Sequence, residues 1–154
     1  MDYESRKAEQ ELAAFRKFAI AANLPISKGS ERNGVAAQGE PDIVCILNGQ
    51  KASFELTTAC APEFAAAAAE AKRSPTGVSV AFGEDVSAET LRKKLAKRYS
   101  VHCAVHLLIY RGLTALTDQM IIDRLRPEID RGLGQFSKIW FHGDKVHLLA
   151  AADS

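Results

Sequence analysis

The sequence feature that most constrains the fold is an Asn-Gly pair between two strand-like runs. Residues 42–47 (DIVCIL) are rich in apolar and β-branched side chains, and residues 52–58 (ASFELTT) form a second such run. Asn48-Gly49, between them, is typical of a two-residue turn in which both central residues take positive φ. The segment therefore predicts a tight antiparallel hairpin.

This turn also predicts which residues face each other across the hairpin. A two-residue turn pairs Leu47 with Gln50, and counting outward places Asp42 opposite Glu55. Directly opposed residues point to the same face, with Cβ atoms roughly 5 Å apart, and like charges there repel. Two interpretations follow: a divalent cation lies between the two acids, or both acids lie on an exposed sheet face and are solvated.

The remaining pattern alternates helices and strands. Periodicity predicts helices over residues 2–22, 61–73 and 87–99, and a further helix that Thr117 caps and Pro127 kinks or interrupts. Strands are predicted over 78–82 and 104–110, with a final hairpin over 136–141 and 145–149, whereas residues 26–40 are mostly typical of a loop. This order predicts an α/β fold with a central mixed sheet flanked by helices. The length of 154 residues suits one domain, 1–154.

Composition restricts the partners and the compartment. The formal net charge is +1, so binding of nucleic acid requires a local basic patch. No apolar run approaches the ~20 residues of a membrane span, and the charged N-terminus does not resemble a signal segment. The three cysteines lack CxxC spacing, which favours free thiols in a reducing compartment. We therefore expect a cytoplasmic protein with no membrane partner.

Two short segments resemble the motif of the PD-(D/E)XK phosphodiesterase superfamily. Gly39-Glu40-Pro41-Asp42-Ile43 is similar to its Pro-Asp strand start, and Phe54-Glu55-Leu56-Thr57 is similar to its acidic residue, spacer and lysine, with Thr57 in place of the lysine. The resemblance implies a restriction-endonuclease-like core. It also implies an endonuclease or exonuclease that hydrolyses DNA, in preference to RNA, with Mg²⁺ or its substitute Mn²⁺. Asp42, Glu55 and the backbone carbonyl of Leu56 would be the metal ligands.

The resemblance directs attention to two further residues. Some members of the superfamily take their lysine from a nearby helix, and Lys94 flanks the apolar stripe of the helix predicted over 87–99. Lys94 is therefore the candidate catalytic lysine, with a merely solubilising surface lysine as the alternative. A first-helix glutamate often completes the metal site in this superfamily. Glu11 lies within the apolar stripe of the first helix and is the candidate for that role, a surface glutamate being the alternative.

The same lysine-rich helix is the candidate nucleic-acid-binding surface. Arg92, Lys93, Lys97 and Arg98 would bind phosphates, with Lys93 and Lys97 on the solvated side of the helix. The alternative is that this charge run is only the wet face of an amphipathic helix.

A catalytically inactive module is the rival to the nuclease interpretation. The missing in-strand lysine and the near-neutral charge favour a nuclease-fold protein that binds nucleic acid or a protein partner, including a homodimer. An exposed apolar surface around Trp140, Phe141, Leu148 and Leu149 would suit such an interface.

Overall fold

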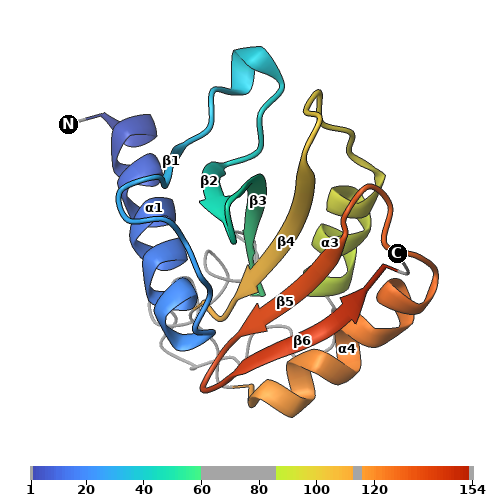
Figure 1. Cartoon of the computed structure of the whole chain (residues 1–154). Coiled ribbons are helices and arrows are strands. Elements are labelled where there is room, and N and C mark those ends of the chain that lie inside the picture. The colour runs from blue at the N-terminus through green and yellow to red at the C-terminus, as the bar shows by residue number, and fades with distance from the viewer. Residues whose placement is uncertain (1, 60–85, 113–115, 153–154) are drawn as a thin grey trace.

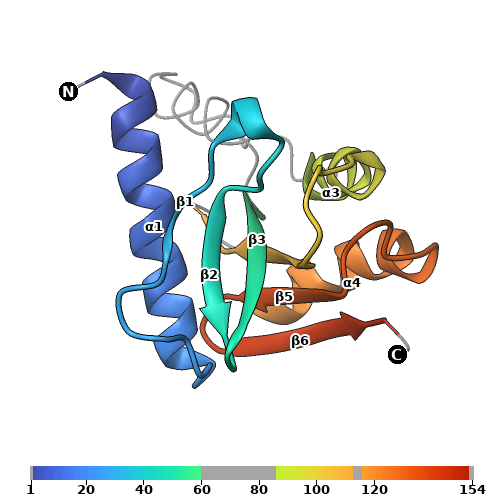
Figure 2. The same cartoon turned by 45° about the horizontal axis from the view of Figure 1, so that its top comes forward.

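The computed structural model describes residues 2–59, 86–112 and 116–152. In these residues a six-stranded mixed sheet lies between one helix on one face and two helices on the other (Figures 1 and 2), which confirms the predicted fold class. The predicted helix 61–73 and strand 78–82 lie outside the described residues. The elements are α1 (Tyr3–Ala21), β1 (Arg32–Asn33), η1 (Ala36–Gln38), β2 (Ile43–Leu47), β3 (Gln50–Thr58), α3 (Val86–Ala96), β4 (Ala104–Tyr110), α4 (Asp118–Asp130), β5 (Lys138–His142) and β6 (Val146–Ala151).

The strands follow one another across the sheet in chain order. Neighbours β1, β2 and β3 are antiparallel, β3, β4 and β5 are parallel, and β5 and β6 are antiparallel. Parallel neighbours need a crossover connection, and α3 and α4 lie in the two crossovers. Because both crossovers advance in the same direction and such connections are right-handed, α3 and α4 cover the same face. The opposite face of β2 and β3 is covered by α1 (Figure 2).

The first hairpin forms as predicted. Asn48 and Gly49 have φ values of 52° and 80°, and the register pairs Leu47 with Gln50 and Ile43 with Phe54. Positive φ at both central positions matches the twist of the flanking strands. The register of the whole hairpin therefore follows from its turn.

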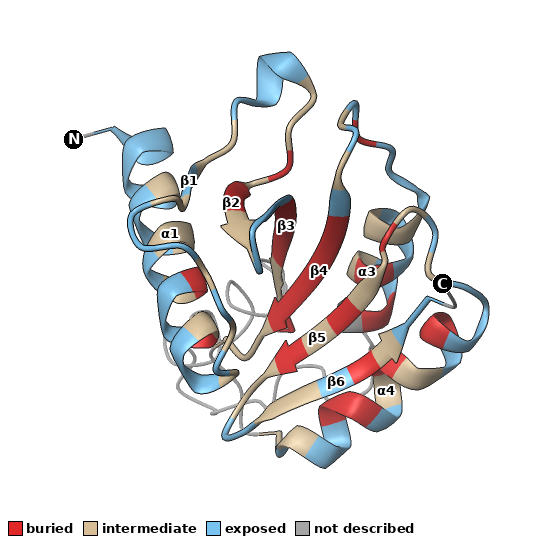
Figure 3. Cartoon of the chain, in the orientation of Figure 1, coloured by how far each residue is buried: buried red, intermediate tan, exposed pale blue. Residues whose placement is uncertain are grey.

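Alternation along the central strands divides the core into two layers. Phe54 on β3 and Leu108 on β4 pack with Phe15 and Phe18 of α1, whereas the neighbouring Leu107 packs with the residues of α3 and α4. Figure 3 shows the buried residues concentrated in the middle strands and on the inner sides of the helices. Among the described residues, the buried polar side chains are Ser53, Glu55, His106 and Glu128.

Several predicted boundaries differ from the structure. The short strand β1 lies in the segment predicted mostly as a loop, because its two residues are polar and carry no strand pattern. Helix α4 is capped by Thr117 as predicted but runs through Pro127 without interruption, to Asp130. Helix α3 ends at Ala96 instead of residue 99.

The apolar interface predicted around Trp140 is wrong in part. Phe141 and Leu149 are buried in the layer beneath α3 and α4, because they occupy the covered face of β5 and β6. Leu148 is exposed and Trp140 half-buried, since both alternate onto the other face. Across residues 2–59, 86–112 and 116–152, no helix combines the length and the apolar character needed to span a bilayer.

His106 is a buried histidine on β4 that is held neutral by its surroundings. Its ring stacks on Phe54 with centroids 4.5 Å apart, and its Nδ1 accepts a hydrogen bond of 3.1 Å from Trp140 Nε1. Burial, and then the positive charge of Lys138, lower the pKa of His106 to about 4. An unfolded histidine has a pKa of about 6.5, so this residue stabilises the fold above that pH, and the contribution is lost as the pH falls toward 4.

We predict that the substitution His106→Gln flattens the acid side of the stability profile. Protonation of His106 in the unfolded chain should cost wild-type protein about 2 kcal/mol of unfolding free energy between pH 7.5 and pH 5. Glutamine does not titrate and keeps an acceptor for Trp140. Urea unfolding of both proteins at the two pH values measures the difference. An equal loss in both proteins would show that the histidine does not carry this pH dependence.

Candidate active site

The loop before β2 holds Asp42 in place. The Arg32 guanidinium donates to both carboxylate oxygens of Glu40, at 3.0 Å each, and Glu40 Oε1 also accepts from the Val35 N–H at 2.9 Å. The Gly34 N–H donates to the Asp42 carbonyl at 2.7 Å. A Cβ on Gly34 would lie 1.7 Å from the Pro41 carbonyl oxygen, so only glycine permits this close approach.

Asp42 and Glu55 meet where the hairpin register predicts. The Asp42 N–H donates to Glu55 Oε1 at 3.2 Å, and the Leu56 N–H donates to Asp42 Oδ2 at 2.9 Å. Glu55 is only 2% exposed. This burial excludes the alternative in which both acids are simply solvated, and it means that the charge of Glu55 needs a partner inside the protein.

Glu11 on α1 supplies a third acid beside this pair. Burial raises the pKa of Glu11, and the negative charge of Glu55 raises this pKa as well. Burial, followed by the negative charges of Glu55 and Glu11, raises the pKa of Asp42 to about 7. The end of the hairpin is therefore a place where additional positive charge is stabilising.

Two lysines reach Glu55 from α3 and the turn after it. Lys94 Nζ lies 2.8 Å and Lys97 Nζ 3.3 Å from Glu55 Oε2, and their side chains are 26% and 53% exposed. Burial pushes the pKa of Glu55 upward, but Lys94, the nearby Tyr99 hydroxyl and Lys97 together outweigh burial and leave this pKa below its ordinary value. Lys94 is thus at the acidic cluster, as the sequence predicted.

Lys97 is exposed, as its predicted position on the solvated side implies, but its ammonium group turns to Glu55, which the prediction did not include. The Lys97 N–H donates to the Lys94 carbonyl at 3.1 Å, so the last turn of α3 tightens to the i to i+3 pattern. In such a turn the side chains at i and i+3 are eclipsed. Lys97 therefore lies above Lys94 and points to the same carboxylate, although uniform helical spacing would direct it away.

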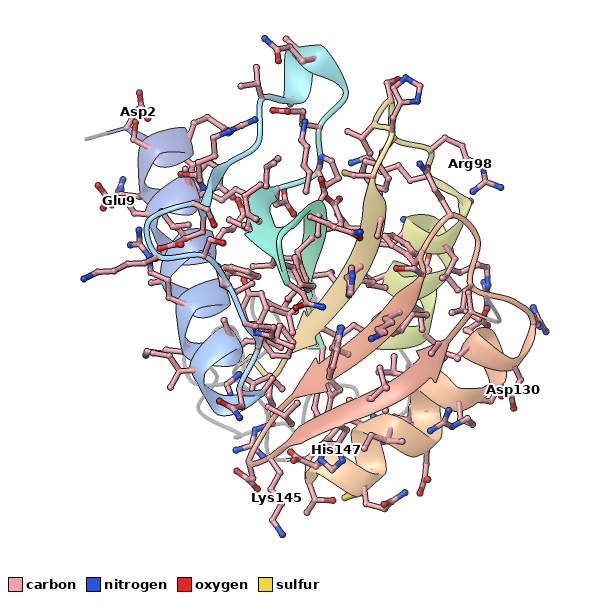
Figure 4. All side chains as sticks on the ribbon, in the orientation of Figure 1. Asp2, Glu9, Arg98, Asp130, Lys145 and His147 are labelled. Carbon is pink, nitrogen blue, oxygen red and sulfur yellow. The ribbon has the colours of Figure 1, made fainter. Side chains whose placement is uncertain are left out.

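The other predicted phosphate-binding residues have different surroundings. Arg92 forms a two-point pair with the buried Glu128 of α4, at 2.7 and 3.2 Å, and so joins α3 to α4. Lys93 is exposed and 3.7 Å from Glu89. Arg98 extends into solvent (Figure 4) and donates to backbone carbonyls of its own turn. The basic run is divided between the site, the helix packing and the surface.

The donors at the hairpin end fit a hard divalent cation. Mg²⁺ takes oxygen ligands and needs only one or two protein carboxylates, with water and substrate supplying the rest. The Leu56 N–H faces Asp42, and in an extended strand the carbonyl of the same residue faces that side too. However, no three or more His, Cys, Asp or Glu side chains in the described ranges converge as in a complete metal site. Asp42, Glu55 and the Leu56 carbonyl are thus the minimal donor set.

Sequence reasoning missed Tyr99, which lies in the connection between α3 and β4. Its hydroxyl is buried, and burial together with the charges of Glu55 and Asp42 raises its pKa. It ends the helix predicted over 87–99, and no sequence signal marks it as a neighbour of the acids.

A scan against protein-family models, a search of curated proteins and a search of solved structures each return no match.

We predict that Lys94→Met destabilises the protein by about 1–3 kcal/mol, because it removes the shorter ion pair of a buried carboxylate. The double variant Lys94→Met with Glu55→Gln should recover most of this loss, since no buried charge then lacks its partner. Lys93→Met, one residue away and exposed, is the matched control and should change stability by less than about 0.5 kcal/mol. Urea unfolding measures all three, and additive effects of the two substitutions would contradict the coupling.

We further predict that Asp42→Asn stabilises the metal-free protein at pH 8 by about 2 kcal/mol. The folded protein binds the Asp42 proton more tightly than the unfolded chain. The stability that this proton contributes is therefore lost as the pH rises from about 4 through about 7. Asparagine keeps an acceptor for the Leu56 N–H and does not titrate. Thermal or urea unfolding in EDTA at pH 5 and pH 8 tests this, and a wild-type protein equal in stability to the variant at pH 8 would contradict it.

Proposed function

We propose that this chain is a metal-dependent phosphodiesterase that hydrolyses nucleic acid, DNA in preference to RNA, using Mg²⁺ or Mn²⁺. The observation that carries the proposal is the contact between Asp42 and the buried Glu55 with Lys94 2.8 Å from Glu55. A lysine from α3 thus lies beside Glu55, which supports the proposal because Thr57 stands at the lysine position of the strand motif. On this proposal the chain is a PD-(D/E)XK-like nuclease that acts in the cytoplasm and has nucleic acid as its partner.

The residues would divide the work as follows. Asp42, Glu55 and the Leu56 carbonyl would hold the cation, and Glu11 would complete its surroundings. When bound, the cation would supply Lewis acidity toward a phosphate oxygen and toward the attacking water. Lys94 is near enough to the acids to donate to the phosphate and to stabilise its developing negative charge.

The surrounding charges would orient the substrate. Lys97, half-exposed beside Lys94, is the next donor available to the phosphate backbone. Arg98 and Lys93, both exposed, would add weaker contacts outside the site. Arg92 would act indirectly, because its pair with Glu128 holds α3, and so Lys94, in position.

One observation favours the inactive module as a second candidate. The ammonium groups of Lys94 and Lys97 already pair with Glu55, so the charge of this carboxylate does not require a metal ion. Such an internally paired cluster would be stable as a structural element of a protein that binds nucleic acid or another protein, or that forms a homodimer. Metal dependence separates the two candidates.

The cleavage test uses supercoiled plasmid and single-stranded DNA with Mg²⁺, Mn²⁺ or EDTA. We predict cleavage only with the cations, loss of cleavage in Asp42→Asn, and a fall of about 10²-fold or more in Lys94→Met. Asp130→Asn is the matched control, because Asp130 is exposed at the end of α4 (Figure 4) and should leave cleavage unchanged. If neither cation permits cleavage nor raises the unfolding temperature, the inactive module is the better account.

A further inference from the structure

Tyr99 is held rigidly by contacts that do not involve its hydroxyl. Its N–H donates to Gln135 Oε1 at 2.7 Å, and its carbonyl accepts from Gln135 Nε2 at 3.0 Å. Its ring packs against Phe136, with centroids 5.9 Å apart, and Lys97 Nζ lies 5.1 Å from the ring centroid. The side chain is therefore fixed in direction by both its backbone and its ring.

The hydroxyl at the end of this fixed ring lacks a partner. Tyr99 is 8% exposed, and its hydroxyl is the buried side-chain polar atom that finds no hydrogen bond within the described parts of the chain. It lies close enough to Glu55 to lower the pKa of that carboxyl, yet among the described residues it makes no hydrogen bond of normal geometry. A buried donor left unpaired in a rigid setting is uncommon and calls for an explanation.

The present partners of Glu55 limit the acceptor positions that are open to the hydroxyl. Glu55 Oε1 accepts from the Asp42 N–H, and Oε2 accepts from both Lys94 and Lys97. The lysines therefore fill the two acceptor positions of Oε2, and one position on Oε1 stays open to the hydroxyl. If the lysines turn to a substrate phosphate, Glu55 loses two donors while remaining buried.

We propose that Tyr99 is a positioning residue for Glu55, whose hydroxyl donates to this carboxylate when a bound cation displaces Lys94 and Lys97 and frees them for phosphate. This inference rests on the proposed function, because it concerns the metal-loaded state of the same site. The hydroxyl would hold the carboxylate in the orientation that the cation requires. It would thereby separate the task of orienting Glu55 from the task of binding phosphate.

The test compares Tyr99→Phe with wild type by Mn²⁺ titration calorimetry and by urea unfolding in EDTA. We expect Tyr99→Phe to weaken Mn²⁺ binding about tenfold, as for the loss of one hydrogen bond to a charged group. The stability of the metal-free protein should not fall, since no hydrogen bond is lost there. Tyr3→Phe, the same change at an exposed tyrosine of α1, should alter neither quantity.

A double-mutant comparison ties the effect to Glu55. In the Glu55→Gln background, Tyr99→Phe should weaken Mn²⁺ binding by a much smaller factor than in wild type. An unchanged Mn²⁺ affinity in Tyr99→Phe, or a loss confined to metal-free stability, overturns the role of Tyr99 and leaves the proposed function intact. Absence of Mn²⁺ binding by wild type overturns both, so the two failures are distinguishable.

Discussion

The structure depends on how it accommodates one charged carboxylate in the interior. Glu55 lies mid-strand between Phe54 and Leu56 and is almost fully buried. A buried carboxylate must find donors of matching charge or give up its ionisation. Two ammonium groups and one backbone N–H supply those donors. Among the described residues the neighbouring Asp42 has no comparable cation, and its pKa rises instead. The pair is therefore unequal, with one acid neutralised by lysines and the other by proton binding or, as we propose, by a metal ion.

The arrangement of α3 and α4 is what makes the lysines available. Both helices lie in right-handed crossovers and cover the face of the sheet on which Glu55 points. The pair between Arg92 and Glu128 fastens α3 to α4, and the apolar layer around Leu91 and Leu107 fixes both to the strands. A helix held in this way presents Lys94 to the strand at short range. Positioning of the site is thus inseparable from packing of this layer.

The metal-free arrangement also bears on how the site would work. Lys94 and Lys97 pair with Glu55, the carboxylate that the cation would need. Binding of the cation therefore requires the lysines to leave Glu55 for other acceptors. This change of partners would cost little free energy, because the incoming phosphate would give the lysines equivalent acceptors and Tyr99 would give Glu55 a replacement donor. Under the proposed function, the cluster would be both a stable resting state and the set of groups needed for phosphodiester hydrolysis. The inactive alternative uses only the first of these properties.

What the sequence determined by itself is local. The Asn48-Gly49 turn dictates the hairpin register, because only residues that tolerate positive φ suit it, and the register brings Asp42 to Glu55. The spacing of the apolar residues predicts the bounds of α1, β4 and α4 to within a few residues of those observed. Tertiary structure decided the rest: that Lys97 joins Lys94, that Arg92 turns to Glu128, and that Tyr99 faces the acids. Those outcomes depend on where a helix ends and on what another element presents there, and such contacts between distant segments leave no periodic trace in the sequence.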